Sequence, residues 1–158
     1  MPTENQSTTE AVELLQSFGS VHKNLFRFVQ KSAADHGLSV PQYSILITLI
    51  SEPALTQKTI GDKTFLPKST LSQAVDGLVK EGLLERQQVE GNRREVLLAL
   101  SEKGLEFIQK LHMKEGSVLD VFQTVINALE PQEVEGLLKT HNRINLLLET
   151  IQLEEQLK

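Results

Sequence analysis

The spacing of apolar residues predicts a long amphipathic helix near the start of the chain. Steps of four and three residues separate Leu14, Phe18, Val21, Leu25 and Phe28. Such steps place side chains on one face of an α-helix, which we expect from about residue 10 to residue 35. Gly37 is expected to end this helix, because glycine readily adopts the left-handed backbone found after helix C-termini.

A second helix is expected from about residue 40 to residue 51. Ser39 and Gln42 have the spacing of a capping box, and Pro41 suits the first turn of a helix. Pro53 disfavours helical geometry at Glu52, which ends the helix there.

Two shorter helices joined by a tight turn follow. Thr56 is the expected N-cap of a helix that runs to about Lys63 with Ile60 facing inward, and residues 65 and 66 form the turn. Pro67 begins the next helix, in which apolar residues repeat at helical spacing until glycine at position 82 ends it. Those apolar residues are Leu71, Val75 and Leu78.

The pattern then changes to a β-hairpin. Two strand-like stretches cover residues 84–89 and 96–100, and the connection between them, residues 90–94, contains a Gly-Asn pair that favours a turn. After the hairpin, Ser101 caps a single long helix expected to reach about residue 128, and Pro131 opens a last helix. The last helix carries an apolar stripe of Val134, Leu137, Leu138, Ile144, Leu148 and Ile151.

This order of elements indicates a mainly α fold with a small β-hairpin, namely a winged helix-turn-helix flanked by helices at both ends. In such folds the second helix of the pair enters the major groove of DNA. We expect one domain over residues 1–158, with a winged helix-turn-helix lobe at 38–100. Residues 10–36 and 101–155 would then form a helical dimerisation region.

The charge distribution agrees with DNA as a partner although the whole chain carries a net charge of −5. Residues 58–94 carry seven basic and five acidic side chains, whereas the segments on both sides have an acidic excess. A local basic segment is what contact with a polyanion requires. The sequence contains no cysteine, which excludes disulfides, thiolate metal sites and peroxide sensing through a thiol.

The residues of this segment also resemble a known family. Residues 56–62, Lys68 to Ser72, residues 80–86, Asn92 to Arg94 and residues 100–104 are similar to the multiple antibiotic resistance regulator (MarR) family. In that family the wing usually reads Asp-x-Arg, and here Asn92 stands in place of the aspartate. The resemblance covers about residues 10–153. It implies a homodimer joined through the first and last helices that binds pseudo-palindromic operators and is often released by a small ligand.

Helical geometry identifies the DNA-reading face of the second helix of the pair. With Leu71 pointing to the core, Ser69, Gln73, Asp76 and Lys80 fall on the opposite face, and Asp76 is expected to pair with Lys80. Gln73 can bind an adenine edge through two hydrogen bonds. The predicted DNA contacts are Lys58, Lys68, Ser69, Thr70, Ser72, Gln73, Arg93 and Arg94, where the arginines probe a minor groove and the lysines bind phosphates.

The remaining partners follow from the apolar stripes and from the resemblance. Apolar faces on the terminal helices predict a two-fold homodimer whose reading helices lie about 34 Å apart, one turn of duplex. The resemblance implies an effector crevice between the dimerisation helices and the DNA-binding lobe, with His22, Phe26 and Tyr43 as candidate lining residues. The first ten residues are polar and no apolar run is long enough to span a bilayer, so we expect a cytoplasmic protein without a membrane partner.

Other classes of function were weighed against DNA binding. The sequence has no glycine-rich phosphate loop, nucleophile elbow or His-Glu-x-x-His helix, so we expect neither an enzyme nor a cofactor. The four histidines, His22, His36, His112 and His141, are not spaced as metal ligands on one helix, and no metal is expected. Two alternatives stay open: a metal-responsive regulator of the same fold, and a winged helix that binds other proteins.

Overall fold

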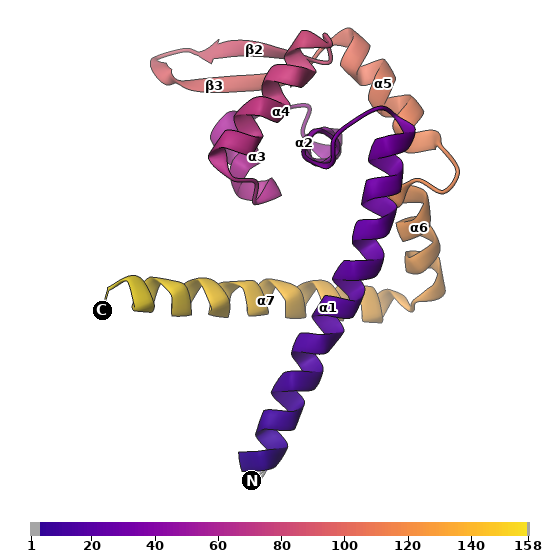
Figure 1. Cartoon of the computed structure of the whole chain (residues 1–158), viewed down its shortest axis with the longest axis vertical. Coiled ribbons are helices and arrows are strands. Elements are labelled where there is room, and N and C mark those ends of the chain that lie inside the picture. The colour runs from indigo at the N-terminus through magenta and orange to yellow at the C-terminus, as the bar shows by residue number, and fades with distance from the viewer. Residues whose placement is uncertain (1–3, 158) are drawn as a thin grey trace. The chain divides into compact units, whose positions relative to one another are not determined.

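The computed structural model describes residues 4–157, with side chains from residue 6 onward, and Figure 1 shows the order of its elements. The chain divides into two compact units that meet between Val118 and Leu119. The described elements of the first unit are five helices and three strands. The second unit contains a long C-terminal helix. None of the described helices combines the length and apolar character that crossing a bilayer requires.

Helix α1 (Glu4–Asp35) begins earlier than the sequence predicts and ends where expected, at a left-handed Gly37 with φ +68°. Helix α2 (Val40–Ser51) confirms its predicted capping box. The Ser39 hydroxyl accepts a hydrogen bond from Gln42 N, and the Gln42 side chain accepts one from Ser39 N. Local sequence alone therefore fixes where α2 begins.

The helix-turn-helix consists of α3 (Gln57–Thr64) and α4 (Lys68–Lys80). The predicted N-cap is confirmed, since Thr56 Oγ1 accepts from Thr59 N at 3.1 Å. The two helices approach closely at Gly61, where an added Cβ would lie 3.1 Å from Leu71 Cδ2. The helices bury one side against α2 and the sheet, and the fully enclosed side chains of this core include Ile45, Leu46, Leu49, Ile60, Val75, Leu78, Leu84 and Leu98.

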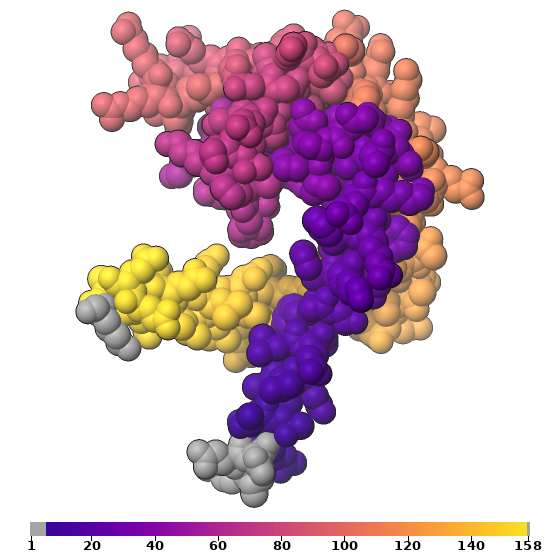
Figure 2. Space-filling model, viewed as in Figure 1, coloured from indigo at the N-terminus to yellow at the C-terminus, as the bar shows by residue number. Residues whose placement is uncertain are grey.

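The wing is a three-stranded antiparallel sheet in the order β1 (Ala54–Thr56), β3 (Asn92–Leu100), β2 (Leu84–Val89). The sequence did not predict β1, which is too short to show an alternating pattern. The predicted five-residue turn was wrong. Only Glu90 and Gly91 lie outside the strands, and Gly91 adopts φ +80°, which only glycine does without strain. The tip of the hairpin projects beyond the helices of its lobe (Figures 1 and 2).

The single helix predicted after the hairpin is also wrong, because it is divided into α5 (Glu102–Met113) and α6 (Val118–Ala128). Its predicted N-cap is confirmed. Ser101 Oγ accepts from Gly104 N at 2.9 Å and donates to Gly82 O at 2.5 Å, which ties the helix to the end of α4. Lys114 is extended and Gly116 has φ +75°, and these two backbone conformations interrupt the helix.

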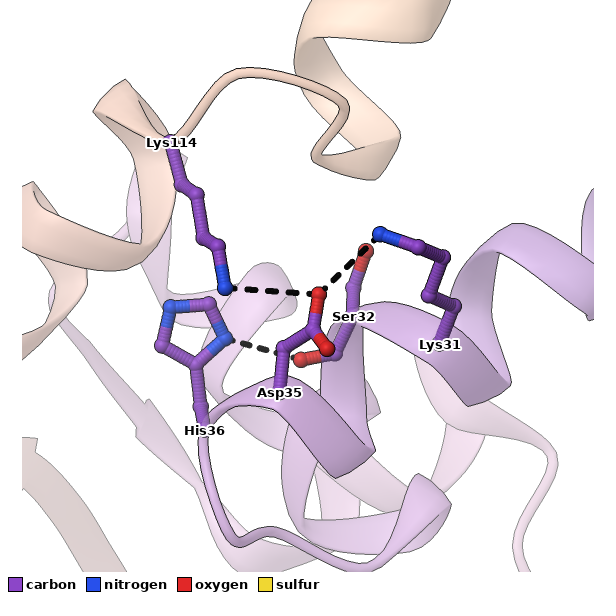
Figure 3. A network of polar contacts seen from close by, with 5 residues as sticks. All are labelled: Lys31, Ser32, Asp35, His36 and Lys114. Atoms are coloured by element: carbon purple, nitrogen blue, oxygen red, sulfur yellow. Dashed lines mark hydrogen bonds and ion pairs between the residues drawn. The ribbon is translucent and has the colours of Figure 1, made fainter.

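A polar network joins the end of α1 to this interruption, as Figure 3 shows. Asp35 accepts from Lys31 at 3.2 Å and pairs with Lys114 at 3.3 Å, while His36 Nδ1 lies 2.8 Å from Ser32 O. Hydrogen bonds from Lys31 and then Lys114 lower the pKa of Asp35 below its ordinary value. The segment after α5 is thereby held against α1 within the first unit.

The second unit contains α7 (Pro131–Gln156), which begins at the predicted proline. Glu133 closes the N-terminus of α7 by accepting from Glu130 N at 2.8 Å. No side chain of α7 is buried, and its exposed apolar residues include Leu137, Leu138, Leu148 and Ile151. A helix of 26 residues with no buried face lacks the tertiary packing that normally stabilises helices in water.

Candidate nucleic-acid interface

Three of the predicted DNA-binding cations line one open groove in the first unit. The groove has a volume of about 630 Å³ and lies between α3, the start of α4 and β3. Lys58 comes from α3, Lys68 from α4 and Arg94 from β3, and two acidic residues, Asp62 and Glu95, also line it. The fold thus gathers charges that are up to 36 residues apart in the sequence onto one concave surface.

The face of α4 that the sequence predicts to read DNA is exposed. Ser69 and Gln73 are exposed and Thr70 is half-buried. The opposite face is buried in the core and consists of Leu71, Ala74, Val75 and Leu78. The side chain that could bind an adenine edge, Gln73, is therefore free to approach a ligand without any change in the core.

The N-terminus of α4 differs from those of α2, α3 and α5. Ser39, Thr56 and Ser101 cap those three helices with side-chain hydrogen bonds. The N-cap of α4 is Pro67, whose side chain makes no such bond. The first backbone N–H groups of a helix carry partial positive charge and bind phosphate well when no side chain occupies them.

The wing presents its two arginines from a strand and not from a turn. Arg94 lines the groove, whereas Arg93 is exposed and does not line it. Asn92 Oδ1 accepts a hydrogen bond from Arg94 N at 3.1 Å. Asn92, which stands where the family usually has aspartate, thus braces the wing through a hydrogen bond to the backbone.

The predicted pairing of Asp76 with Lys80 is wrong. The carboxylate of Asp76 instead pairs with the guanidinium of Arg86 on β2. The strand lies beside α4, and a planar guanidinium reaches the carboxylate more directly than a flexible lysine one helical turn away. Sequence spacing within one helix could not reveal a partner on a neighbouring strand.

Comparisons with known proteins match this geometry. A model of the MarR family matches residues 36–95, which include α2, α3, α4 and β2. The organic hydroperoxide resistance transcriptional regulator of Bacillus subtilis is 29% identical over 72% of each chain. The crystal structure of AbsC, a MarR family transcriptional regulator from Streptomyces coelicolor, has a TM-score of 0.70 and 25% identity, and covers 95% of this chain and 98% of its own. Over residues 36–95 this chain is therefore similar to the MarR family.

A second structural relative has the same fold. Sco3205, a MarR family transcriptional regulator from Streptomyces coelicolor, was solved in complex with DNA. It has 22% identity and a TM-score of 0.67 over 94% of both chains. The likeness confirms the winged helix fold.

Two further side chains, which the sequence did not single out, lie at the candidate interface. Gln57 lines the groove and donates from Nε2 to Ser72 Oγ at 3.4 Å. Ser72 is half-buried, so its hydroxyl joins α3 to α4 and is less accessible than Ser69. Arg86, the partner of Asp76, is the second such residue. A hydrogen-bond partner 15 residues away in the sequence leaves no local signal.

The three candidate effector residues lie in two different surroundings. The rings of His22 and Phe26 stack on α1 with centroids 5.8 Å apart. Tyr43 is only 1% exposed and packs in a second core cluster with Ala33 and Leu111. Burial raises the pKa of Tyr43, and its hydroxyl makes no regular hydrogen bond even though it lies near Ser32 and Val118. The assignment of these residues to a ligand stays a prediction.

Among the residues that the structure describes, no group of three or more His, Cys, Asp or Glu side chains could hold a metal ion. The metal-responsive alternative therefore has no candidate site in this part of the chain.

Proposed function

We propose that this chain is a sequence-specific transcription regulator of the MarR family that binds double-stranded DNA through α4 and the wing. The convergence of Lys58, Lys68 and Arg94 on one groove beside the exposed face of α4 carries this proposal. In it, Ser69, Thr70 and Gln73 contact base edges or nearby phosphates, while Ser72 holds α4 in place and reaches the backbone. The lysines bind phosphates, and the uncapped N-terminus of α4 receives another phosphate.

Arg93 and Arg94 act differently in this proposal because Arg94 lines the groove and Arg93 does not. Arg94 faces the groove and enters the minor groove of the duplex, where a narrow groove attracts a guanidinium. Arg93 contacts the adjacent phosphate backbone. The tip of the hairpin projects from the lobe (Figure 2), and both arginine side chains are exposed.

The active form is proposed to be a homodimer that binds a pseudo-palindromic operator. Each unit exposes apolar side chains of a long helix: Leu14, Leu15 and Val21 on α1, and the stripe of α7. A second copy would cover these surfaces, as symmetric oligomers usually do. The proposed activity is repression, which needs no more than a bound operator, and a small ligand releases the DNA. The protein acts in the cytoplasm and carries out no catalysis.

Replacement of Arg94 by alanine tests the proposed interface. The side chain is exposed, so we expect the melting temperature to stay within about 1 °C while affinity for a duplex recovered from a random pool falls about tenfold. The measurement is the dissociation constant over a series of salt concentrations. If Arg94 also neutralises a phosphate, the slope of log affinity against log salt will become shallower by about one unit.

Lys110→Ala is the matched control, because Lys110 is an exposed cation on α5, outside the groove. The control should bind DNA as the unaltered protein does. Equal affinity of the Arg94 variant and the unaltered protein would contradict the role of the wing. Absence of DNA binding by the unaltered protein would contradict the proposed function itself.

A further inference from the structure

The turn between α3 and α4 holds an aromatic residue in an unusual backbone conformation. Phe65 has φ 56° and ψ 21°, in the left-handed region, and is the only non-glycine residue with positive φ in the described part of the chain. Glycine adopts this region freely and asparagine tolerates it, whereas a bulky side chain clashes with its own backbone. The position is thus one at which phenylalanine is disfavoured by local geometry.

The ring does not offset this strain by packing in the core. Phe65 is 88% exposed, so nearly all of its apolar surface faces solvent. The one hydrogen bond that the residue makes to close α3, from its N–H to Gly61 O at 2.9 Å, uses the backbone and would form equally with glycine. A residue held in a disfavoured backbone conformation is a candidate for a functional role, and the exposed ring is accessible to a partner.

The position of Phe65 indicates what that partner is. It precedes Lys68 by three residues and Ser69 by four, and its neighbour Leu66 lines the groove that holds Lys58, Lys68 and Arg94. The uncapped end of α4 follows directly. A duplex with a phosphate bound at this end of α4 would therefore lie close to Phe65.

We propose that Phe65 is a DNA-contacting residue, whose ring packs on an apolar edge of the duplex at the N-terminal end of α4. The chemistry of that edge is either a thymine methyl group or the hydrocarbon face of a deoxyribose, and apolar side chains such as phenylalanine do contact thymine methyl groups. This inference rests on the proposed function, and it adds an apolar contact to an interface otherwise made of cations and hydroxyl groups.

Phe65→Gly and Phe65→Asn test the proposal, because both residues suit the left-handed backbone. We expect their melting temperatures to equal or exceed that of the unaltered protein, while affinity for a duplex recovered from a random pool falls about fivefold or more. The dependence of affinity on salt should stay the same, since an apolar contact releases no counterions. Met113→Asn is the control, because Met113 is also apolar and exposed (83%) but lies at the end of α5.

Two results would overturn the proposal. The first is equal affinity of Phe65→Gly and the unaltered protein. The second is a shallower salt dependence in both variants, which would mean that the substitutions displace α4 and its phosphate contacts. A duplex with deoxyuridine in place of thymidine separates the two contacts. If Phe65 touches a thymine methyl group, the unaltered protein will bind this duplex more weakly, whereas the affinity of Phe65→Gly will not change. If Phe65 touches deoxyribose, the unaltered protein will still bind this duplex more tightly than Phe65→Gly does. Failure of the unaltered protein to bind any duplex would instead contradict the proposed function.

Discussion

Gly77 determines how closely α4 approaches the start of α2. A Cβ at this position would lie 2.5 Å from Gln42 Nε2, which is closer than side-chain atoms tolerate. The amide of Gln42 cannot easily move away, because its oxygen accepts the hydrogen bond from Ser39 N that completes the capping box of α2. The contact with Gln42 of α2 therefore explains a glycine in the middle of α4.

Replacement of Gly77 by alanine should leave stability nearly unchanged. Alanine is favoured over glycine in a helix by about 1 kcal/mol, but the displaced Gln42 would lose a hydrogen bond worth a similar amount. In a Gln42→Ala background the long side chain at position 42 is absent. There Gly77→Ala should raise the free energy of unfolding by about 1 kcal/mol. Urea denaturation of the four proteins measures both effects. If Gly77→Ala alone raises the free energy of unfolding by about 1 kcal/mol, the contact between Gly77 and Gln42 does not constrain α4.

Residues that act through the neighbouring backbone were predictable from the sequence, and those that act through distant partners were not. The caps Ser39, Thr56 and Ser101 have local spacing rules, and all three are confirmed. The contact of Gly77 with Gln42 joins positions 35 residues apart and follows no such rule.

At the scale of elements, the Asp76–Arg86 ion pair joins the reading helix to the wing. Both side chains are substantially exposed (66% for Asp76 and 42% for Arg86), so the pair contributes little to stability. Its larger effect in the proposed function is electrostatic. Arg86 neutralises a carboxylate on the face of α4 that we propose faces DNA, where an unpaired acid would repel phosphates.

Arg86→Ala should therefore weaken DNA binding by about 1 kcal/mol, roughly fivefold, with little change in melting temperature. Adding Asp76→Asn to that variant removes the repelling charge and should restore most of the affinity. The measurement is the dissociation constant of the four proteins for one duplex at constant salt. If the double variant binds as weakly as Arg86→Ala alone, Arg86 contacts DNA directly and the account of this pair is incorrect.

The sequence predicted the helices of the helix-turn-helix with their ends, because periodicity and caps indicate the same boundaries there. It failed where tertiary contacts decide. The three residues of β1 become a strand only because they pair with β3, from Ala54 opposite Ala99 to Thr56 opposite Leu97. The division between α5 and α6 follows the extended Lys114, which Asp35 of α1 holds in place. Residues 114–117 are polar and include Gly116, a helix-ending signal that the prediction did not use.

At the scale of the whole molecule, sequence reasoning located most of the candidate interface. Lys58, Lys68 and Arg94, selected from residue type and order alone, line one groove. Arg93 was assigned together with Arg94, but Arg93 does not line this groove. The exposed turn residue Phe65 carried no signal in the sequence, because its left-handed backbone is visible only in the structure.

The proposed dimer is needed both for the stability of the terminal helices and for recognition of DNA. The apolar stripe of α7 has no buried side chain within its own unit, and the exposed apolar residues of α1 likewise have no cover in theirs. Two copies joined through such surfaces present two reading helices to one face of a duplex. The arrangement of the DNA sequence that the protein selects therefore reports on the dimer as well as on the interface.

Selection of bound duplexes from a random pool tests the central claim most directly. The account predicts enrichment of two inverted half-sites whose centres lie about 10 base pairs apart, one turn of the double helix. It also predicts that Gln73→Ala changes the preferred base at one position of each half-site. Recovery of no preferred sequence, or of a single half-site without its inverted copy, would contradict the account of a dimer that reads DNA through α4.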